Sequence, residues 1–119
     1  MSSKTNPGQA LSDLQESSQA HDIKELLDFV PEAIVSRVLI KTDSGSVTLF
    51  AFWQGQGLSE HISPHDALVQ ILQGQATITI EDTEHSVAAG QVLLLPARRP
   101  HSVQANENLK MLLTILKST

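Results

Sequence analysis

The sequence predicts an all-β fold, a small sandwich or barrel, for residues 33–117. Short segments rich in apolar and β-branched residues follow one another through this region, as half-buried strands do. Residues that favour turns separate these segments at intervals of about 8–12 residues. No stretch of the region has the helical periodicity that a fold of alternating strands and helices requires. The chain of 119 residues suits one domain of this kind.

Each predicted strand is justified by its own pattern and by the turn signal that ends it. The first contains the β-branched residues Ile34, Val35, Val38 and Ile40 and runs into the turn sequence TDSGS. Gly74 is predicted to turn the chain after the third strand, and the fourth alternates cleanly between apolar and polar residues. Two sheets closed face to face would hide the strand edges. The predicted strands span residues 33–41, 46–53, 67–73, 76–82, 85–87, 91–96, 102–105 and 110–117.

The N-terminal part of the chain has a different character. Residues 1–20 are rich in Ser, Gln, Asn and Gly, which predicts a flexible tail. Residues 21–32 are predicted to form a short helix that packs on the barrel. Asp22 is a candidate cap for its start, Pro31 ends it, and an apolar stripe lies between them, formed by Ile23, Leu26, Leu27 and Val30.

Composition excludes several classes of protein. The formal net charge is −5, and among the eight Lys and Arg only Arg98 and Arg99 adjoin, which argues against a nucleic-acid partner. No apolar run is long enough for a membrane helix, and the N-terminus lacks the apolar stretch of a signal peptide. The chain has no cysteine, so disulfides and thiolate metal sites are excluded, and a cytoplasmic location is expected.

Residues 55–105 carry two spaced motifs. The first reads Gly55-x5-His61-x-Ser63-x3-Ala67-x6-Gly74, and after fifteen residues the second reads Gly90-x5-Pro96-x-Arg98-x2-His101-x3-Ala105. They resemble the two motifs of the cupin superfamily, G-x5-H-x-H-x3-E-x6-G and G-x5-P-x-G-x2-H-x3-N. Every spacing matches, and four residue types differ. The resemblance covers about 85 residues and looks closest to small stand-alone uncharacterised bacterial cupins. It implies an RmlC-like double-stranded β-helix, or jelly-roll, barrel.

The same resemblance implies a metal site of which half the ligands are present. Metal-binding cupins use the residues at positions 61, 63, 67 and 101, where this chain has His61, Ser63, Ala67 and His101. His65 shares the alternation of His61, so the candidate metal ligands are His61, His101 and His65. Two imidazoles alone make a weak site, because transition metals usually have three or more protein ligands. No cofactor is therefore required, and a divalent metal (zinc, iron, manganese or nickel) is left open.

The predicted pocket lies where the two motifs meet. Arg98 and Arg99 either reach its mouth and bind a carboxylate or phosphate, or are solvated loop residues. Trp53 either floors the pocket or packs in the core, and His65 either lines the pocket or lies on the surface. The full set of predicted pocket residues is His61, Ser63, His65, Ala67, His101, Arg98 and Trp53.

Three classes of function follow from these predictions. The favoured one is a module that binds a small molecule in the pocket without chemistry, and no catalytic residue is assigned. The alternative is a metal-dependent cupin enzyme, an oxidoreductase of the dioxygenase type or an isomerase, that uses His61, His101 and His65. The third is a structural or regulatory protein that acts through a dimer interface. The resemblance implies a homodimer, and segments 33–41 and 111–117, apolar on both alternating faces, suit strands that are buried on both sides.

Overall fold

The computed structural model describes residues 19–117, and these residues confirm the all-β prediction. One helical turn, η2 (Ile23–Glu25), precedes the strands. Among the described residues, no helix is long and apolar enough to cross a membrane. The strands are β1 (Ile34–Thr42), β2 (Gly45–Phe52), β3 (Gly57–His61), β4 (Asp66–Gln73), β5 (Gln75–Ile80), β6 (Thr83–Ala88), β7 (Val92–Leu95), β8 (His101–Ala105) and β9 (Leu109–Leu116).

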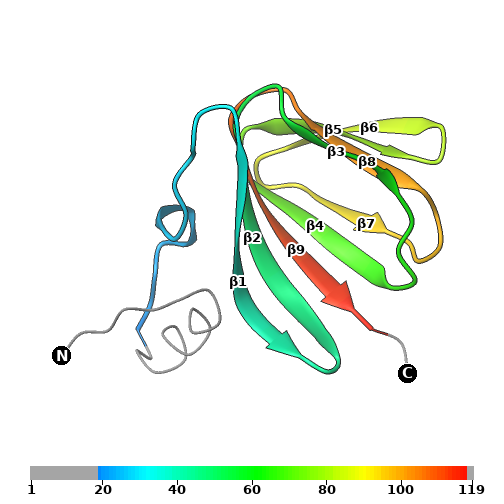
Figure 1. Cartoon of the computed structure of the whole chain (residues 1–119), viewed down its shortest axis with the longest axis horizontal. Coiled ribbons are helices and arrows are strands. Elements are labelled where there is room, and N and C mark those ends of the chain that lie inside the picture. The colour runs from blue at the N-terminus through cyan, green and yellow to red at the C-terminus, as the bar shows by residue number, and fades with distance from the viewer. Residues whose placement is uncertain (1–18, 118–119) are drawn as a thin grey trace.

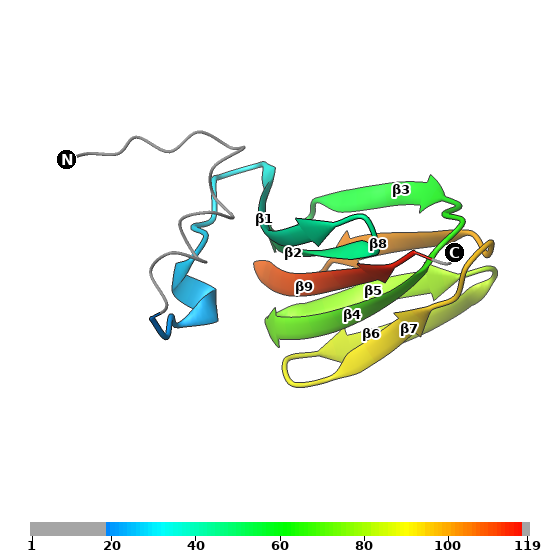
Figure 2. The same cartoon turned by 90° about the horizontal axis from the view of Figure 1, so that it is seen from below.

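The strands form two antiparallel sheets that face each other. One sheet has five strands in the order β1-β2-β9-β4-β7, and the other has four in the order β3-β8-β5-β6. Neighbours in a sheet are mostly distant in sequence, as when β9 pairs with both β2 and β4 (Figure 1). Seen from below, the five-stranded sheet lies in front of the four-stranded sheet (Figure 2). This crossing between sheets is the jelly-roll arrangement predicted from the motifs.

Strand alternation fills the space between the sheets with apolar side chains. On β9, Met111 lies directly opposite Phe50 of β2 and Ile71 of β4, so three strands contribute to one layer of the core. Ile78 of β5 is fully buried on the facing sheet. The buried cluster comprises Phe52, Ala67, Val69, Ile71, Ala76, Ile78, Val87, Leu95, Val103, Ala105, Leu109 and Met111.

Gly74, predicted to turn the chain, joins β4 to β5 in a conformation that favours glycine. Its φ is 85°, in the left-handed region. A Cβ atom there would lie 2.3 Å from the carbonyl oxygen of Asn108. The position therefore needs glycine twice over, for the turn itself and for the close approach of the backbone that leads into β9.

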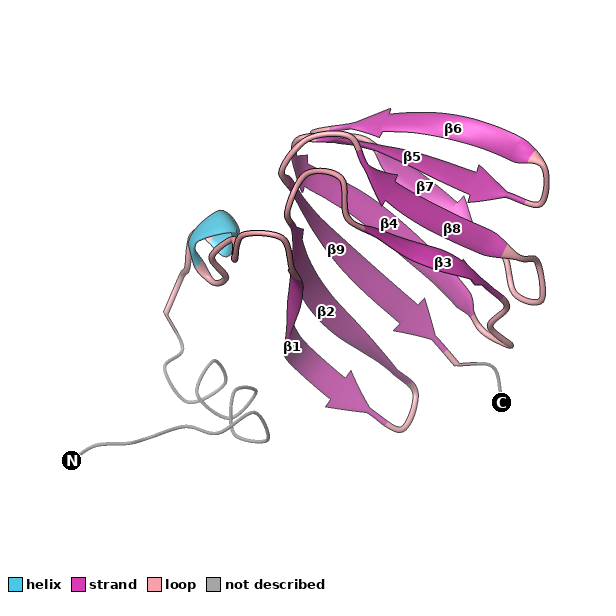
Figure 3. Ribbon diagram, turned by 45° about the horizontal axis from the view of Figure 1, so that its top comes forward, coloured by secondary structure: helices cyan, strands magenta, loops and turns pink. Residues whose placement is uncertain are grey.

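The predicted N-terminal helix is much shorter than the sequence pattern indicated. The Asp22 carboxylate caps η2 by accepting from the backbone N–H of Lys24, but the helical hydrogen bonding ends at Leu26. Pro31 disfavours helical geometry in the residue before it, and so short a helix has little intrinsic stability. Figure 3 shows this single turn beside the sheets. The predicted flexible tail, residues 1–20, lies almost wholly outside the described residues.

Contacts with the five-stranded sheet hold the N-terminal segment in place. The guanidinium of Arg37 on β1 donates to the carbonyl oxygen of Leu26 at 3.0 Å. The ammonium of Lys110 on β9, only 7% exposed, donates to the carbonyl oxygen of Lys24 at 2.6 Å and lies 4.8 Å from the ring centre of Phe29. Lys110 points away from the barrel interior, because its neighbour Met111 points into it. Arg37 lies on the same outer face, because it pairs with Leu49, two residues before the Lys110 partner Ala51. The segment thus covers part of the outer face of the sheet.

Strand β3 was not among the predicted strands. Its sequence GLSEH is mostly polar, and four of its five residues are exposed. Within residues 19–117 it is an edge strand whose one neighbour is β8, with a register shift between Leu58 and His61. An exposed edge strand of this kind has no apolar alternation by which to recognise it.

Candidate functional site

The two motif histidines are brought together by strand pairing. His61 is the last residue of β3 and His101 the first of β8, and the two are direct partners in the antiparallel ladder. Directly opposite residues have Cβ atoms about 4.5–5.5 Å apart, so their side chains meet on one face of the sheet. The rings are T-shaped, with centroids 4.3 Å apart.

The hydrogen bonds of the pair restrict its protonation. Nδ1 of His61 lies 3.0 Å from the carbonyl oxygen of Ser59, and Nδ1 of His101 lies 3.2 Å from that of Arg99. A carbonyl oxygen only accepts, so each Nδ1 must donate, and each Nε2 is left to face the other at 3.1 Å. A hydrogen bond between the two Nε2 atoms needs a third proton, which gives the pair one positive charge. This end of the site is therefore neutral or positive.

The two histidines differ in exposure. His61 is exposed, whereas His101 is 6% exposed. Burial lowers the pKa of His101 below its usual 6.5, and the nearby His61 lowers it further, while the hydrogen bond to the Arg99 carbonyl opposes both. Protonating the His101 ring is therefore costlier in the folded chain than in water.

A cavity of about 220 Å³ lies between the two sheets beside the pair. One end is polar, with His61, His101 and Ser63. The rest of the wall is apolar and comes from strands of both sheets: Leu58, Ala67, Leu95, Val103, Met111, Leu113 and Ile115. The cavity is smaller than the roughly 300–1,000 Å³ of sites for drug-sized ligands. It suits a compact molecule with an apolar body and one polar end.

The structure places three of the predicted pocket residues outside the cavity wall. Trp53 is half-buried directly after β2, where its backbone N–H donates to the carbonyl oxygen of Ala33. His65 is half-buried in the β3–β4 loop, and its Nδ1 has no hydrogen-bond partner among residues 19–117. Arg98 is exposed in the β7–β8 loop. Because β3 ends at His61, the alternation that linked His61 to His65 does not continue as far as His65.

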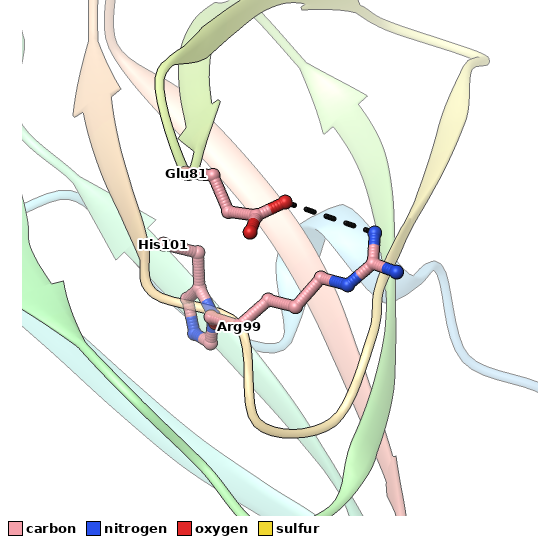
Figure 4. A network of polar contacts seen from close by, with 3 residues as sticks. All are labelled: Glu81, Arg99 and His101. Atoms are coloured by element: carbon pink, nitrogen blue, oxygen red, sulfur yellow. Dashed lines mark hydrogen bonds and ion pairs between the residues drawn. The ribbon is translucent and has the colours of Figure 1, made fainter.

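The β7–β8 loop is anchored on both sides of the site. The backbone N–H of Arg98 donates to the carbonyl oxygen of Ser63 at 2.7 Å, and the backbone N–H of Ala97 donates to the carboxylate of Asp66 at 2.8 Å. On the other side, Arg99 and Glu81 form an exposed ion pair at 3.8 Å (Figure 4). These contacts fix the carbonyl of Arg99 that accepts from His101, so the loop sets the orientation of the buried imidazole.

With this geometry established, a family assignment can be made from the sequence. The sequence model of the family described as "Cupin domain" matches residues 48–115, more than half of the chain. The chain belongs to the cupin family. The resemblance predicted from the two motifs is confirmed.

Solved cupin-like structures resemble this cupin over most of its length. A conserved protein of unknown function from Streptococcus pyogenes has 34% identity and a TM-score of 0.82, covering 86% of this chain and 90% of that one. A cupin superfamily protein from Desulfitobacterium hafniense has 29% identity and a TM-score of 0.81, covering 85% and 93%. A cupin 2 conserved barrel domain protein from Leptotrichia buccalis has 35% identity and a TM-score of 0.76, covering 79% and 46%. No curated protein matches the chain.

The donor set of this cupin does not fit a three- or four-ligand metal centre. Ser63 and Ala67 both line the cavity, at the positions where the family motif has histidine and glutamate. Residues 19–117 contain no group of three or more His, Cys, Asp or Glu side chains arranged to hold a metal ion. His65 does not join the pair. The two Nε2 atoms converge, but nothing within this part of the chain completes a coordination sphere around them.

Sequence reasoning missed most of the apolar wall. Val103 and Met111 could have been found from strand alternation, because they share parity with His101 and with the inward residues of β9. Leu58 could not, because β3 was not recognised and its register shifts before His61.

Proposed function

We propose that this cupin binds a small molecule in the cavity, with the polar end of the ligand against His61, His101 and Ser63. The supporting observation is the division of the wall: seven apolar residues from both sheets and one polar end. Ligand sites of this composition bury an apolar body and orient it through a few polar groups. The imidazoles, held through Nδ1 by backbone carbonyls, are oriented before a ligand arrives.

A thermal-shift screen of small sugars, keto acids, carboxylic acids and their neutral analogues tests this proposal. A ligand that binds only the folded chain raises the Tm with its concentration. His101→Gln should reduce the shift, whereas His85→Gln, at a half-buried β6 residue outside the cavity wall, should not. A hit unaffected by His101→Gln would place binding elsewhere and contradict the proposal.

The alternative predicted from the sequence, a metal-dependent oxidoreductase or isomerase, finds less support. Such an enzyme would need a third and fourth ligand where Ser63 and Ala67 lie. Metal analysis of untagged protein, before and after incubation with zinc, iron, manganese or nickel, separates the two. A stoichiometric ion that is lost in both His61→Ala and His101→Ala would favour the enzyme.

We also propose that the chain forms a homodimer through the outer face of the five-stranded sheet. Apolar side chains on that face are strongly exposed, from Ile40 on β1 (41%) through Leu116 on β9 (64%) to Val92 and Leu94 on β7 (57% and 54%). A hollow of about 200 Å³ lies beside Ile40 and Leu116. Apolar surface of this extent is usually covered by a partner, and an identical face is the simplest match under two-fold symmetry.

A further inference from the structure

Arg98 occupies a backbone conformation that arginine rarely adopts. Its φ is 66°, in the left-handed region where a Cβ atom is strained and glycine is favoured. It stands at the position of a glycine in the second motif. Strained residues of this kind cluster at functional sites. The question is what an arginine contributes here that glycine would not.

Arg98 begins beside the polar end of the cavity, although its side chain is not part of the wall. The backbone N–H of Arg98 donates to the carbonyl oxygen of Ser63, which is a wall residue. The long, exposed side chain of Arg98 therefore starts beside the cavity and has the reach to turn toward it. Within residues 19–117 Arg98 has no ion-pair partner, whereas the neighbouring Arg99 is paired with Glu81.

Among residues 19–117, the wall of the cavity contains no carboxylate at its polar end. The His61–His101 pair has no carboxylate grouped with it in the described part of the chain. The carboxylate of Asp66, the residue before Ala67, accepts from the backbone N–H of Ala97. In a chain with a net charge of −5, Arg98 thus adds a positive charge beside the polar end of an otherwise apolar cavity.

We infer that the ligand is a small organic monocarboxylate with an apolar body, and that Arg98 selects its charge. This inference rests on the proposed function and adds the chemical class of the ligand. The guanidinium fork matches a carboxylate, and the hydroxyl of Ser63 is a further donor at the same end. The apolar wall favours an organic acid over a bare anion, because the wall offers an inorganic ion no hydrogen bonds.

The test compares carboxylates with their uncharged primary amides by isothermal titration calorimetry. The probes are benzoate, isovalerate and hexanoate, each against its amide, with inorganic phosphate as the bare anion. Carboxylates should bind tighter than the matching amides, and the preference should shrink between 0.05 and 0.5 M NaCl, because salt screens an exposed charge. Phosphate should bind more weakly than any carboxylate.

Arg98→Gly should separate charge selection from folding. The variant should weaken carboxylate binding roughly fivefold, as loss of one exposed charge does, and leave amide binding within about twofold. Its Tm should rise by roughly 2–5 °C, because glycine relieves the left-handed strain. Arg98→Lys, which keeps the charge but loses the fork, should lie between the two in carboxylate affinity.

Glu32→Gly is the matched control. Glu32 is exposed, also left-handed (φ 61°) and outside the cavity wall, so its replacement should raise the Tm similarly and leave all affinities unchanged. Amides that bind as tightly as carboxylates, or carboxylate affinity unchanged in Arg98→Gly, would overturn the inference while leaving the proposed function standing. Phosphate binding as tight as benzoate would overturn it too. If no carboxylate binds, the inference fails, and the wider thermal-shift screen then decides the proposed function.

Discussion

At the scale of single residues, the site depends on how the protons of one histidine pair are arranged. Both Nδ1 atoms of His61 and His101 face carbonyl oxygens, so the tautomers of the neutral rings are set by the backbone. Neutral rings then turn two lone pairs toward each other across 3.1 Å. Of the two rings, His101 is the buried one, and burial lowers its pKa.

We expect the stability of the chain to fall as the pH drops below about 6.5. The pKa of His101 is lowered in the folded state by burial and by His61, so the unfolded chain binds more protons in this range. The free energy of unfolding therefore decreases as the pH falls from about 6.5, and it stops decreasing on this account below the folded-state pKa of His101. His101→Gln should flatten the pH dependence of the free energy of unfolding in urea, whereas His85→Gln should retain it. An unchanged slope in His101→Gln would contradict this account.

We expect two substitutions to give this chain the four metal ligands of the family motif. Ala67→Glu alone should destabilise the fold by about 1–3 kcal/mol, because the longer side chain must fit among the apolar wall residues around position 67. Ser63→His/Ala67→Glu should regain stability when zinc is added, as a ligand specific for the folded state provides. The Tm with and without EDTA, and the zinc content, measure the effect. A zinc-independent Tm in the double variant would mean that positions 61, 63, 67 and 101 do not converge.

Much of this site could be predicted from residue spacing, and the rest depended on backbone detail. The motif spacings placed His61, Ser63, Ala67 and His101 around one cavity, because strand alternation and pairing are regular there. Spacing left two alternatives each for His65 and Trp53, because both lie outside the strands, where alternation does not determine direction. The left-handed conformation of Arg98 could not be seen in its residue type.

At the scale of elements, the turns are as informative as the strands. Gly74 and Gly90 both have a φ near 85–89°, yet their surroundings differ. A Cβ atom at Gly74 would collide with the backbone of Asn108, whereas a Cβ atom at Gly90 would meet nothing within 4 Å. Comparing these two glycines therefore separates the cost of a left-handed backbone from the cost of a steric collision.

Gly74→Ala should therefore cost more than Gly90→Ala. We expect about 1 kcal/mol for Gly90→Ala, from the left-handed backbone alone. Gly74→Ala should cost about 1–3 kcal/mol more, because β9 must shift away from the added methyl. Equilibrium urea denaturation measures both. Equal losses would show that the β4–β5 turn accommodates the methyl without displacing β9.

The elements that escaped prediction did so for identifiable reasons. The helix predicted within residues 21–32 had the apolar spacing of a helix, but its last residues precede Pro31, which disfavours helical geometry before it. The Phe29 ring packs against the ammonium of Lys110. Strand β3 has no apolar alternation because it is a solvated edge. The strands β4 and β9 were recognised as apolar runs of strand length, and β5 was recognised by its alternation.

At the scale of the whole molecule, the proposed dimer makes a prediction about mass. The chain should sediment at twice 12.9 kDa at micromolar concentration. Leu94→Asp and Leu116→Asp, on the outer sheet face, should shift it to the monomer, because a buried unpaired charge at an interface is costly. Ile62→Asp is the matched control, at a loop residue that is 63% exposed and lies off that face. A wild-type monomer, or a dimer that survives both substitutions, would refute the interface.

Among the described strands β3 bonds only to β8, so we expect this wall of the cavity to open more readily than the rest of the barrel. Leu58 and His61 belong to that wall, and β3 forms the edge of its sheet. Amide hydrogens of β3 should exchange with deuterium faster than those of β9, which is paired on both sides. A bound ligand that contacts His61 should slow that exchange. How quickly a ligand arrives and leaves would then depend on the fraying rate of five mostly polar residues.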